Sequence, residues 1–431
     1  MKRKIIFDAT VLINMVNANS SRSGICLAVY NILVQLCQSN CDMYLYTPDK
    51  KHLGRILYLM DEDKHLSNCK LLGKGVVTYC LLKLEKYRFL LKCSKHFGFV
   101  RHFLSLPLLF VRILKSLKLD IGSKIDFSKF DVYISPVEWF PEYIEHLDNL
   151  EKYIILYDTI PLTFRKFFDS YPKDFWYYKM VEKLDEKTKA FAISQSTKND
   201  FLKYCPKMKA ENITVIPLAT NDNFYKCNDK AKIIATKKKY NIPLDKKYIF
   251  SLCTIEPRKN LLFAIKNFLK FIDKNNINDF IFVLGGGHWD AFLSQFKEEV
   301  GNIEKYKDKI VRIGYVDDED LSALYSDAFC FVYPSLYEGF GLPPLEAMKC
   351  GAPVITSDVS SLPEVVGDDA IKINPKDDVA LQNAYKKLYE NEELRIDLAN
   401  RGLKRAELFS WKKTADIIVD KIDFDLKKKN P

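Results

Sequence analysis

Glycine is scarce in this chain. Only 16 of the 431 residues are glycine, against about 7% in average proteins. The scarcity excludes collagen-like, flexible-linker and low-complexity sequences. The remaining glycines include groups around Gly24, at residues 285–287, and at Gly339 and Gly341. Each group follows a predicted strand, so we expect glycine there because the backbone comes close to a ligand or to another segment.

The sequence also lacks the patterns of a disulfide scaffold and of a zinc site. Its 11 cysteines are scattered singly, with no Cys-x-x-Cys pair and no cysteine–histidine cluster of zinc-ligand spacing. An odd number of cysteines within apolar stretches is typical of reduced thiols in a cytosolic protein. At roughly 100–200 residues per domain the chain is long enough for two hydrophobic cores. Stability therefore requires neither crosslinks nor a structural metal.

No long apolar run has the character of a membrane span. The longest uncharged stretch, residues 23–41, contains Asn31, Gln35, Gln38 and Asn40, which favours a buried helix. The basic N-terminus and the apolar residues 5–7 imitate a signal peptide only briefly, because Asp8 interrupts the run. We expect a first β-strand there and a cytoplasmic location.

Positive charge is confined to one part of the chain. Residues 64–119 contain twelve Lys/Arg and one acid, a local balance of +11, whereas the whole chain carries +10. Basic residues at 112, 115 and 118 alternate with leucine and isoleucine at helical spacing, the pattern of an amphipathic helix with a cationic face. This segment favours peripheral contact with an anionic membrane surface. Ordinary domain helices with solvated lysines are the alternative, and no nucleic-acid-binding motif accompanies the charge.

Short apolar runs alternate with helical patterns in both halves of the chain. Strands are predicted at residues 4–12, 43–46, 132–135, 153–157, 190–194 and 213–217, and again at 248–253, 280–284, 310–313, 328–333 and 353–357. Helices are predicted at residues 24–37, 197–204, 261–273, 318–326, 344–350 and 410–426. This alternation is typical of doubly wound α/β domains with parallel sheets. We expect one domain over residues 1–225 and a second over 226–410, joined by a polar linker at 221–247, with a C-terminal helix within 411–431.

The most specific motif runs from residue 333 to residue 348. A buried strand ends in a loop that contains Gly339 and Gly341, and Pro343 and Pro344 then open a helix. Amides at a helix N-terminus suit an anion. Glu338 lies in the loop and Glu346 in the helix, so both carboxylates can face one crevice at the carboxyl end of the sheet.

Two further motifs follow strands of the second half. Arg258 and Lys259 are adjacent cations after the strand at 248–253, and together they can neutralise a diphosphate through an arginine fork and a lysine charge. Gly285 and Gly286 follow the strand at 280–284, which is consistent either with a nearby phosphate or with a plain turn.

Together these motifs resemble the donor domain of the family 4 glycosyltransferases of the GT-B fold. The resemblance is dense from about residue 245 to 411. It rests on residues 256–260, 314–316, 320–325, 338–346, 351–357 and 361–368. In the first half it is thinner and rests on residues 22–25, 157–162 and 192–198. The resemblance implies two Rossmann-like domains that face each other across a cleft, with a C-terminal helix that crosses back to the first domain.

The resemblance also implies roles for the motif residues. Arg258 and Lys259 would hold the diphosphate of a nucleotide-sugar and stabilise it as the leaving group, so that no metal and no other cofactor is needed. Glu346 would accept hydrogen bonds from the ribose, and Glu338 would contact the donor sugar. The remaining donor-side residues would be Gly285, Gly286, Gly339, Phe340, Gly341 and Leu342, with backbone amides offered by the last three. The acceptor side would hold Gly24, Glu138, Tyr157 and Asp158, and Asp158 would lie near the attacking hydroxyl. Many family members have histidine where this chain has Tyr157.

The resemblance implies a bacterial-type retaining glycosyltransferase that acts on a lipid-linked surface glycan such as O-antigen or capsule. Mannose from GDP-mannose is the donor that we expect, with UDP-hexoses next. A nucleotide-sugar epimerase or sugar phosphorylase of the same fold, and a non-catalytic nucleotide-sugar-binding scaffold, are the alternatives. Metal-dependent transfer is a further alternative, because Asp-x-Asp triplets occur at residues 61–63, 318–320 and 423–425. None of them follows an apolar strand in a nucleotide-binding half.

Overall fold

The structure is a computed structural model that describes residues 2–16, 24–73, 125–167, 172, 175–287 and 289–429. Most of the basic segment, residues 74–119, lies outside the described residues, as do Arg22 and Ser23 of the first glycine loop. Among the helices of the described ranges, none has both the length and the hydropathy needed to cross a bilayer.

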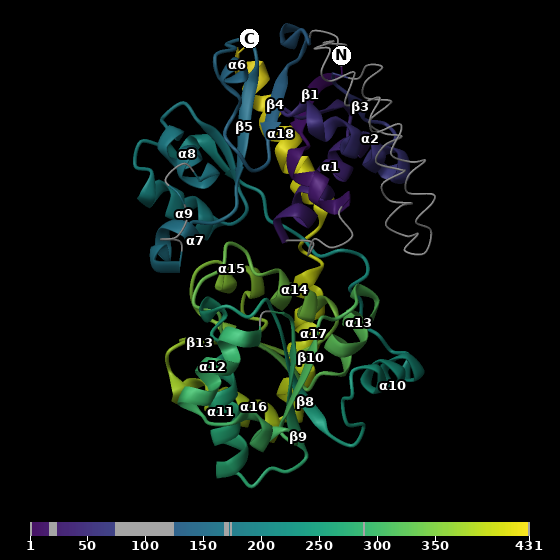
Figure 1. Cartoon of the computed structure of the whole chain (residues 1–431), viewed down its shortest axis with the longest axis vertical. Coiled ribbons are helices and arrows are strands. Elements are labelled where there is room, and N and C mark those ends of the chain that lie inside the picture. Colours follow the sequence, from purple (N-terminus) through teal and green to yellow (C-terminus); the bar gives the residue numbers. More distant parts are fainter. Residues whose placement is uncertain are drawn as a thin grey trace, which may run out of the picture.

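The first half of the chain forms a seven-stranded parallel sheet. Its order is β3-β2-β1-β4-β5-β6-β7. The strands are β1 (Arg3–Asp8), β2 (Cys41–Tyr46), β3 (Lys70–Leu71), β4 (Val132–Ser135), β5 (Glu151–Leu156), β6 (Lys189–Ala192) and β7 (Ile213–Val215). The central strands are apolar on both faces, as is expected of a parallel sheet covered by helices. The covering helices include α1 (Gly24–Gln38), α2 (Leu53–Glu62), α6 (Glu142–Glu145), α7 (Ile160–Thr163), α8 (Trp176–Lys183) and α9 (Gln195–Tyr204) (Figure 1).

The second half forms a six-stranded parallel sheet in the order β10-β9-β8-β11-β12-β13. The strands are β8 (Lys247–Leu252), β9 (Phe280–Gly285), β10 (Ile310–Gly314), β11 (Cys330–Tyr333), β12 (Val354–Ser357) and β13 (Ile371–Ile373). The helices are α11 (Leu261–Lys274), α12 (Trp289–Glu299), α13 (Asp318–Asp327), α14 (Leu342–Lys349), α15 (Leu362–Val366), α16 (Asp378–Glu390) and α17 (Glu392–Ala406). Both halves therefore have the doubly wound α/β architecture that the sequence predicts.

Each sheet has one switch point, where the strand order turns from one direction to the other. In the second sheet it lies between β8 and β11, and in the first between β1 and β4. Ligands of open α/β sheets bind at the carboxyl ends of the strands beside such a point. The loops that follow β8 and β11 carry the two strongest motifs, so the topology brings these motifs together.

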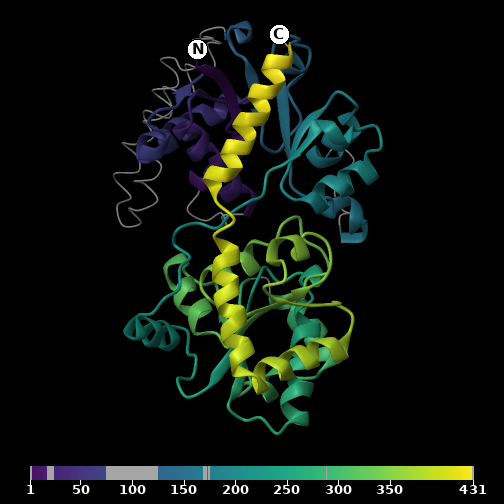
Figure 2. The ribbon, with the colours of Figure 1, turned by 180° about the vertical axis from the view of Figure 1, so that it is seen from behind.

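The C-terminal helix returns to the first domain. After α17, which packs against α14, the chain continues as α18 (Trp411–Lys429), and this helix packs against α1. Figure 2 shows the long helix running from the second domain up along the first. A hydrogen bond of 2.8 Å from the Tyr153 hydroxyl to Asp425 and an ion pair between Arg3 and Asp423 fix it there. The two domains are therefore joined by a second chain crossing besides the linker.

Two details of the sequence prediction are wrong. The strand expected over residues 4–12 ends at Asp8, because the Asp8 carboxylate accepts hydrogen bonds from the backbone N–H and the hydroxyl of Thr10 and turns the chain. A 3₁₀-helix over Thr10–Val16 follows.

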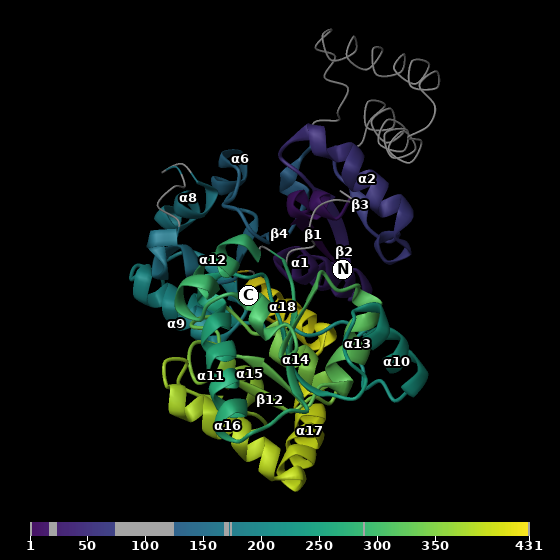
Figure 3. The ribbon, with the colours of Figure 1, turned by 60° about the horizontal axis from the view of Figure 1, so that its bottom comes forward.

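The segment expected as a polar linker at 221–247 contains a helix, α10 (Lys230–Lys239), which is capped by Asp229. It packs beside α13, as Figures 1 and 3 show. Its lysines pair with acids of that neighbourhood: Lys237 is buried and lies 3.1 Å from Asp327, and Lys239 contacts Asp317 and Asp320. The lysine run therefore belongs to the interface between α10 and α13. The polar composition of the segment did not indicate this interface.

Candidate functional site

Glu338 is the centre of a buried polar cluster at the switch point of the second sheet. It lies in the loop between β11 and α14, and it is 8% exposed. Its Oε1 atom is 2.6 Å from the Ser335 hydroxyl, 2.7 Å from Lys259 Nζ and 2.9 Å from Arg258 Nη1. The hydroxyl of Tyr333 donates to the same oxygen over 3.0 Å.

The two cations keep Glu338 ionised. Burial by itself raises the pKa of this carboxyl, but the charges of Lys259 and Arg258 and their hydrogen bonds outweigh it, so that its pKa is lowered from the usual value. The same carboxylate, together with Glu256, raises the pKa of Arg258 against the opposite effect of burial. The cluster therefore holds fixed charges of both signs in a water-poor site, where their interactions with a ligand are strong.

The loop after β8 fixes Arg258 and Lys259. A 3₁₀-turn over Pro257–Lys259 ends at Asn260, which has a left-handed backbone with φ of 58°. The Asn260 side chain donates to the backbone oxygens of Pro334 and Pro375 and so ties this loop to the loop after β11. Arg258 donates over 2.5 Å to the backbone oxygen of Tyr337 and contacts Glu256 over 3.2 Å.

Tyr333 also belongs to the cluster, although the motif analysis assigned no role to it. Its ring is buried, Lys259 Nζ lies 5.1 Å from the ring centre, and Lys259 also donates to the Tyr333 hydroxyl over 2.6 Å. The hydroxyl passes a hydrogen bond on to Glu338. Tyr333 and Ser335 stand at the start of the motif. The residue pattern does not distinguish these two side chains, which point into the site, from the side chains of an ordinary buried strand.

Glu346 lies on α14, about one turn after the start of this helix. Its Oε2 atom accepts a hydrogen bond of 3.2 Å from the buried Tyr325 hydroxyl. Burial raises the pKa of Glu346 to about 7, although the Tyr325 hydrogen bond acts in the opposite direction. This carboxyl therefore changes charge near neutral pH, unlike Glu338.

Hydroxyl groups from both domains hold the carbonyls of the glycine loop. The Ser361 hydroxyl lies within hydrogen-bond distance of the carbonyls of Glu338 and Phe340, at 2.8 and 2.5 Å, and its one proton can bond to either. Ser194, at the N-cap of α9 in the first domain, donates to the carbonyl of Gly339 over 2.7 Å. Because a planar trans peptide directs its N–H opposite to its C=O, the amides of Gly339, Phe340 and Gly341 point away from these hydroxyls. Leu342, the next residue, begins α14.

Tyr157 and Asp158 follow β5 and meet the glycine loop from the first domain. A side chain at Gly339 would lie 2.3 Å from the Tyr157 carbonyl oxygen and 2.9 Å from Asp158 Cβ. Burial raises the pKa of Asp158, while Arg258 lowers it and Glu338 raises it, which shows that the two domains share one electrostatic environment. The predicted acceptor-side aspartate is thus beside the predicted donor-side cluster.

Gly339→Ala should prevent the domains from closing in this arrangement. The added methyl group meets the backbone of Tyr157, just after β5, rather than a movable side chain, so relief requires the loop or the whole domain to shift. We expect at least a tenfold loss of turnover, together with a larger radius of gyration in small-angle X-ray scattering. Gly301→Ala is a control for the general cost of replacing a glycine, because a Cβ there has no neighbour within 4 Å while its φ of +110° strains the backbone. Full activity and unchanged scattering of Gly339→Ala would contradict the close approach.

The other predicted residues lie outside the Glu338 cluster. Gly24 begins α1. Glu138 lies beyond β4 with an exposed side chain, and its backbone oxygen accepts a hydrogen bond of 2.5 Å from the Ser135 hydroxyl. Partial loss of water around its carboxyl, together with the Asp8 charge, raises the pKa of Glu138. Gly285 and Gly286 have a packing role, because a Cβ at Gly286 would lie 1.8 Å from the Cys253 carbonyl oxygen and one at Gly285 would lie 2.6 Å from Leu252.

The three Asp-x-Asp triplets have structural partners. Asp320 pairs with Lys239, Asp425 with Lys189 and Lys421, and Asp63 caps a 3₁₀-turn through the His65 amide. No group of three or more metal-ligating side chains occurs in the part of the chain that the structure describes.

Sequence comparison gives matches to glycosyltransferases. Residues 232–405 match the family described as "Glycosyl transferases group 1". The serotype-specific mannosyltransferase WbdA of Escherichia coli is 31% identical over 272 residues, which are 62% of this chain and 32% of WbdA. O-antigen chain mannosyltransferase B of Escherichia coli is 32% identical over 244 residues, 56% of this chain and 62% of that protein. The chain thus spans about a third of the length of WbdA and less than two thirds of the second relative.

Structural comparison extends the likeness to the whole chain. WaaG, a glycosyltransferase involved in lipopolysaccharide biosynthesis, superimposes with a TM-score of 0.60 and covers 97% of this chain and 99% of its own, at 13% identity. At that identity the likeness concerns the fold alone. It confirms the predicted GT-B arrangement of two Rossmann-like domains.

Proposed function

We propose that the chain, whose residues 232–405 match the family described as "Glycosyl transferases group 1", is a family 4 glycosyltransferase that transfers a sugar from a nucleoside-diphosphate donor to a growing surface glycan. The observation that carries the proposal is the convergence of Arg258, Lys259 and Glu338 at the switch point of the second sheet. Asp158 lies opposite them across the domain contact.

The charges of the cluster match a donor diphosphate. Within the buried cluster, Arg258 and Lys259 share one carboxylate, that of Glu338. Arg258 also pairs with Glu256, whose side chain is exposed. A diphosphate can replace Glu256 as the partner of Arg258 while Glu338 remains in place. The two cations then stabilise the charge that develops on the leaving group, which is the role of a metal ion in other transferases.

The proposed transfer proceeds with retention of anomeric configuration and without a metal. The bond from the donor C1 to the phosphate oxygen breaks, and the leaving nucleoside diphosphate keeps the electron pair. The acceptor oxygen forms its bond to C1 on the same face, and its proton passes to the leaving phosphate oxygen. Glu338 supports the positive charge that develops at C1, and Asp158 orients the acceptor hydroxyl, so positioning contributes more than a strong protein base.

The donor that we propose is GDP-mannose, and the acceptor a lipid-linked glycan of O-antigen or capsule type. Two relatives at about 31% identity are named as mannosyltransferases, and one of them as an O-antigen chain enzyme. UDP-hexoses remain the second choice for the donor, since donor selectivity depends on a few pocket side chains.

The test of the proposed function is the release of nucleoside diphosphate from GDP-mannose and from UDP-hexoses, with and without membranes that contain lipid-linked glycan. We expect release to depend on the acceptor. Conversion of a nucleotide-sugar alone would indicate an epimerase instead. Binding of a nucleotide-sugar without any turnover, in a protein whose Glu338 and Lys259 are intact, would indicate the scaffold alternative.

Nucleotide affinity should depend on pH through Glu346. If its carboxylate accepts hydrogen bonds from the ribose, only the ionised form binds well, and a pKa of about 7 means that the ionised fraction rises about tenfold between pH 6 and pH 8. The dissociation constant of GDP should fall by a similar factor over this range. The free energy of unfolding changes in the opposite sense, because a raised carboxyl pKa stabilises the fold at low pH and this contribution is lost as the pH rises through 7. Calorimetric titration of Glu346→Gln should show weak, pH-independent binding, and an unchanged pH profile in that variant would contradict the assignment.

Peripheral membrane attachment is proposed for the basic segment 64–119. The support is its sequence, with a balance of +11 and an amphipathic pattern. Reversing Lys92, Lys95, Arg112 and Lys115 together to glutamate should release the protein from anionic vesicles in a sedimentation assay. Vesicle binding that is unchanged in this variant would show that the segment is an ordinary domain surface.

A further inference from the structure

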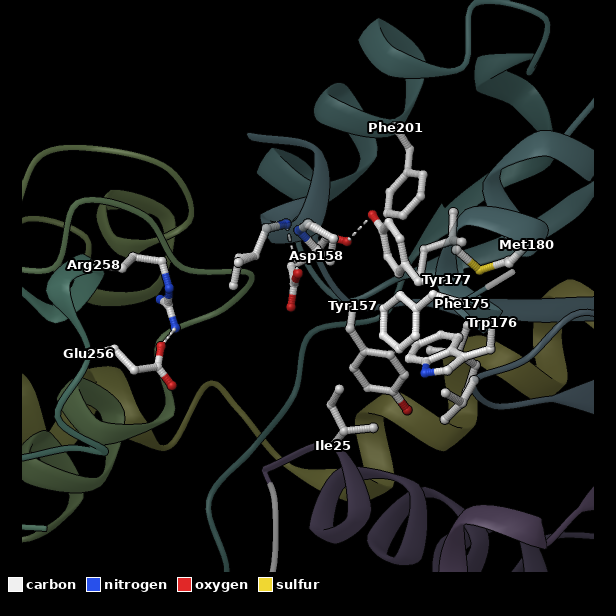
Figure 4. Close-up of a pocket in the computed structure, with 15 residues that line it drawn as sticks. Ile25, Tyr157, Asp158, Phe175, Trp176, Tyr177, Met180, Phe201, Glu256 and Arg258 are labelled. Atoms are coloured by element: carbon white, nitrogen blue, oxygen red, sulfur yellow. Dashed lines mark hydrogen bonds and ion pairs between the residues drawn. The ribbon is translucent and has the colours of Figure 1, made fainter. Parts of the chain in front are cut away.

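An apolar cavity of about 260 Å³ opens beside Asp158 on the first domain. Its wall is mainly apolar: it contains the aromatic side chains of Tyr157, Phe175, Trp176, Tyr177 and Phe201, and aliphatic side chains that include Ile25 and Met180. Figure 4 shows the aromatic side chains gathered on one side of Asp158, and Glu256 and Arg258 on the other. The cavity therefore lies in the first domain but opens toward the cations of the second.

Among the described residues, few side chains of the cavity wall can bond a hydroxyl group. The charged ones in this part of the chain are Asp158, Glu256 and Arg258, and they lie together on the side of the cavity that faces the second domain. We call this side its mouth. The Tyr177 hydroxyl is already engaged, since it donates over 2.9 Å to the Asp158 backbone oxygen. The Tyr157 hydroxyl is turned toward the helix that carries Ile25 (Figure 4), and within the described residues it has no hydrogen-bond partner. A ligand hydroxyl buried here would lose its bonds to water without replacement.

On the basis of the proposed function, we infer that this cavity binds the terminal sugar of the acceptor through an apolar edge, and that this sugar is a 6-deoxyhexose, with a methyl group in place of a hydroxymethyl group. The methyl group and the C–H face of the ring pack against Trp176 and Met180. The attacking hydroxyl then lies at the polar mouth beside Asp158, within the field of Arg258.

The size and position of the cavity favour a single sugar over the lipid of the acceptor. Its volume is just below the range of about 300–1,000 Å³ that holds larger ligands, which is too little for a long polyisoprenoid chain. The acceptor hydroxyl that reacts must also come close to Arg258, where the donor diphosphate is proposed to bind. Arg258 lines the cavity, so a sugar in the cavity meets this requirement. An apolar wall excludes water from the same place and so limits hydrolysis of the donor.

The inference can be tested with two matched pairs of p-nitrophenyl glycosides and the full chain saturated with GDP. The pairs are α-L-rhamnoside against α-L-mannoside and α-L-fucoside against α-L-galactoside, which differ only in the methyl or hydroxymethyl group at C5. Ligand-observed NMR titration should show that the 6-deoxy member of at least one pair binds about 10- to 100-fold more tightly, the range over which an apolar pocket discriminates such groups.

The variant Trp176→Ala should weaken that binding at least tenfold. Tyr178→Ala is the matched control, because Tyr178 is on the same helix, is half-buried, and is not part of the cavity wall. Failure of every glycoside to bind, equal binding within both pairs, or insensitivity to Trp176→Ala would overturn the inference. A thermal shift with GDP-mannose or a UDP-hexose separates the two proposals. If a nucleotide-sugar stabilises the protein but the glycosides fail, only the acceptor inference is wrong; if no nucleotide-sugar binds, the proposed function itself is wrong.

Discussion

Glu338→Gln should lower kcat by about 10²- to 10³-fold, the usual effect of removing one preorganised charge from a transition-state site. Glutamine has nearly the same shape and can still accept hydrogen bonds from Ser335 and Tyr333 through its amide oxygen. What is lost is the negative charge that would stabilise the developing positive charge at the donor C1. The affinity for GDP alone should stay the same or increase, because Lys259 and Arg258 lose a competing carboxylate.

The Glu338 prediction is checked by initial rates of nucleotide release and by calorimetry with GDP, after circular dichroism shows that the variant is folded. Glu304→Gln is a suitable control, because this carboxylate is exposed and pairs with Arg312 on the surface. Weaker GDP binding with an unchanged kcat in Glu338→Gln would mean that Glu338 serves the nucleotide and not the sugar.

Lys259→Met should reduce both nucleotide affinity and turnover. Methionine keeps the apolar contact with the Tyr333 ring but removes the ammonium group that lies 2.7 Å from Glu338. The leaving diphosphate loses one of its two cations, and we expect a loss of about 100-fold in kcat/KM. GDP affinity should fall in Lys259→Met, whereas it should stay the same or increase in Glu338→Gln, so the pair of variants separates the phosphate-binding role from the sugar-binding role.

The control for this change is Lys270→Met, which removes an exposed lysine from an ion pair with Asp378. Surface pairs of this kind contribute about 0–1 kcal/mol to stability, so its kinetics should match those of the wild type. Loss of activity in Lys259→Met without any change in GDP affinity would argue against a role in diphosphate binding.

Sequence reasoning predicted the features that follow from local pattern. Continuous apolar runs gave the central strands, because a parallel sheet buries both faces of its strands. The strand order then brings the loops after β8 and β11 together, and with them Arg258, Lys259 and Glu338. The resemblance to the family 4 glycosyltransferases implied that these residues share one donor site, and the switch-point rule was applied to Glu338 and Glu346.

The features that sequence reasoning missed depend on contacts between distant segments. Tyr333 reads as one more buried strand residue, yet its hydroxyl joins Lys259 to Glu338. Gly339 reads as a phosphate-loop glycine, yet its lack of a side chain also admits the Tyr157 carbonyl from the other domain. Neither the periodicity of the sequence nor a local motif indicates which backbone segment of the other domain a residue will contact.

The most direct test of a nucleotide-sugar site between β8 and β11 is calorimetric titration of the wild type and of Lys259→Met with a panel that contains GDP-mannose and UDP-hexoses. At least one nucleotide-sugar should bind the wild type at one site per chain, and its affinity should fall by at least about tenfold in Lys259→Met, the usual cost of losing a hydrogen bond to a charged group. Absence of binding by every member of the panel, or equal affinity in the two proteins, would contradict the proposed site.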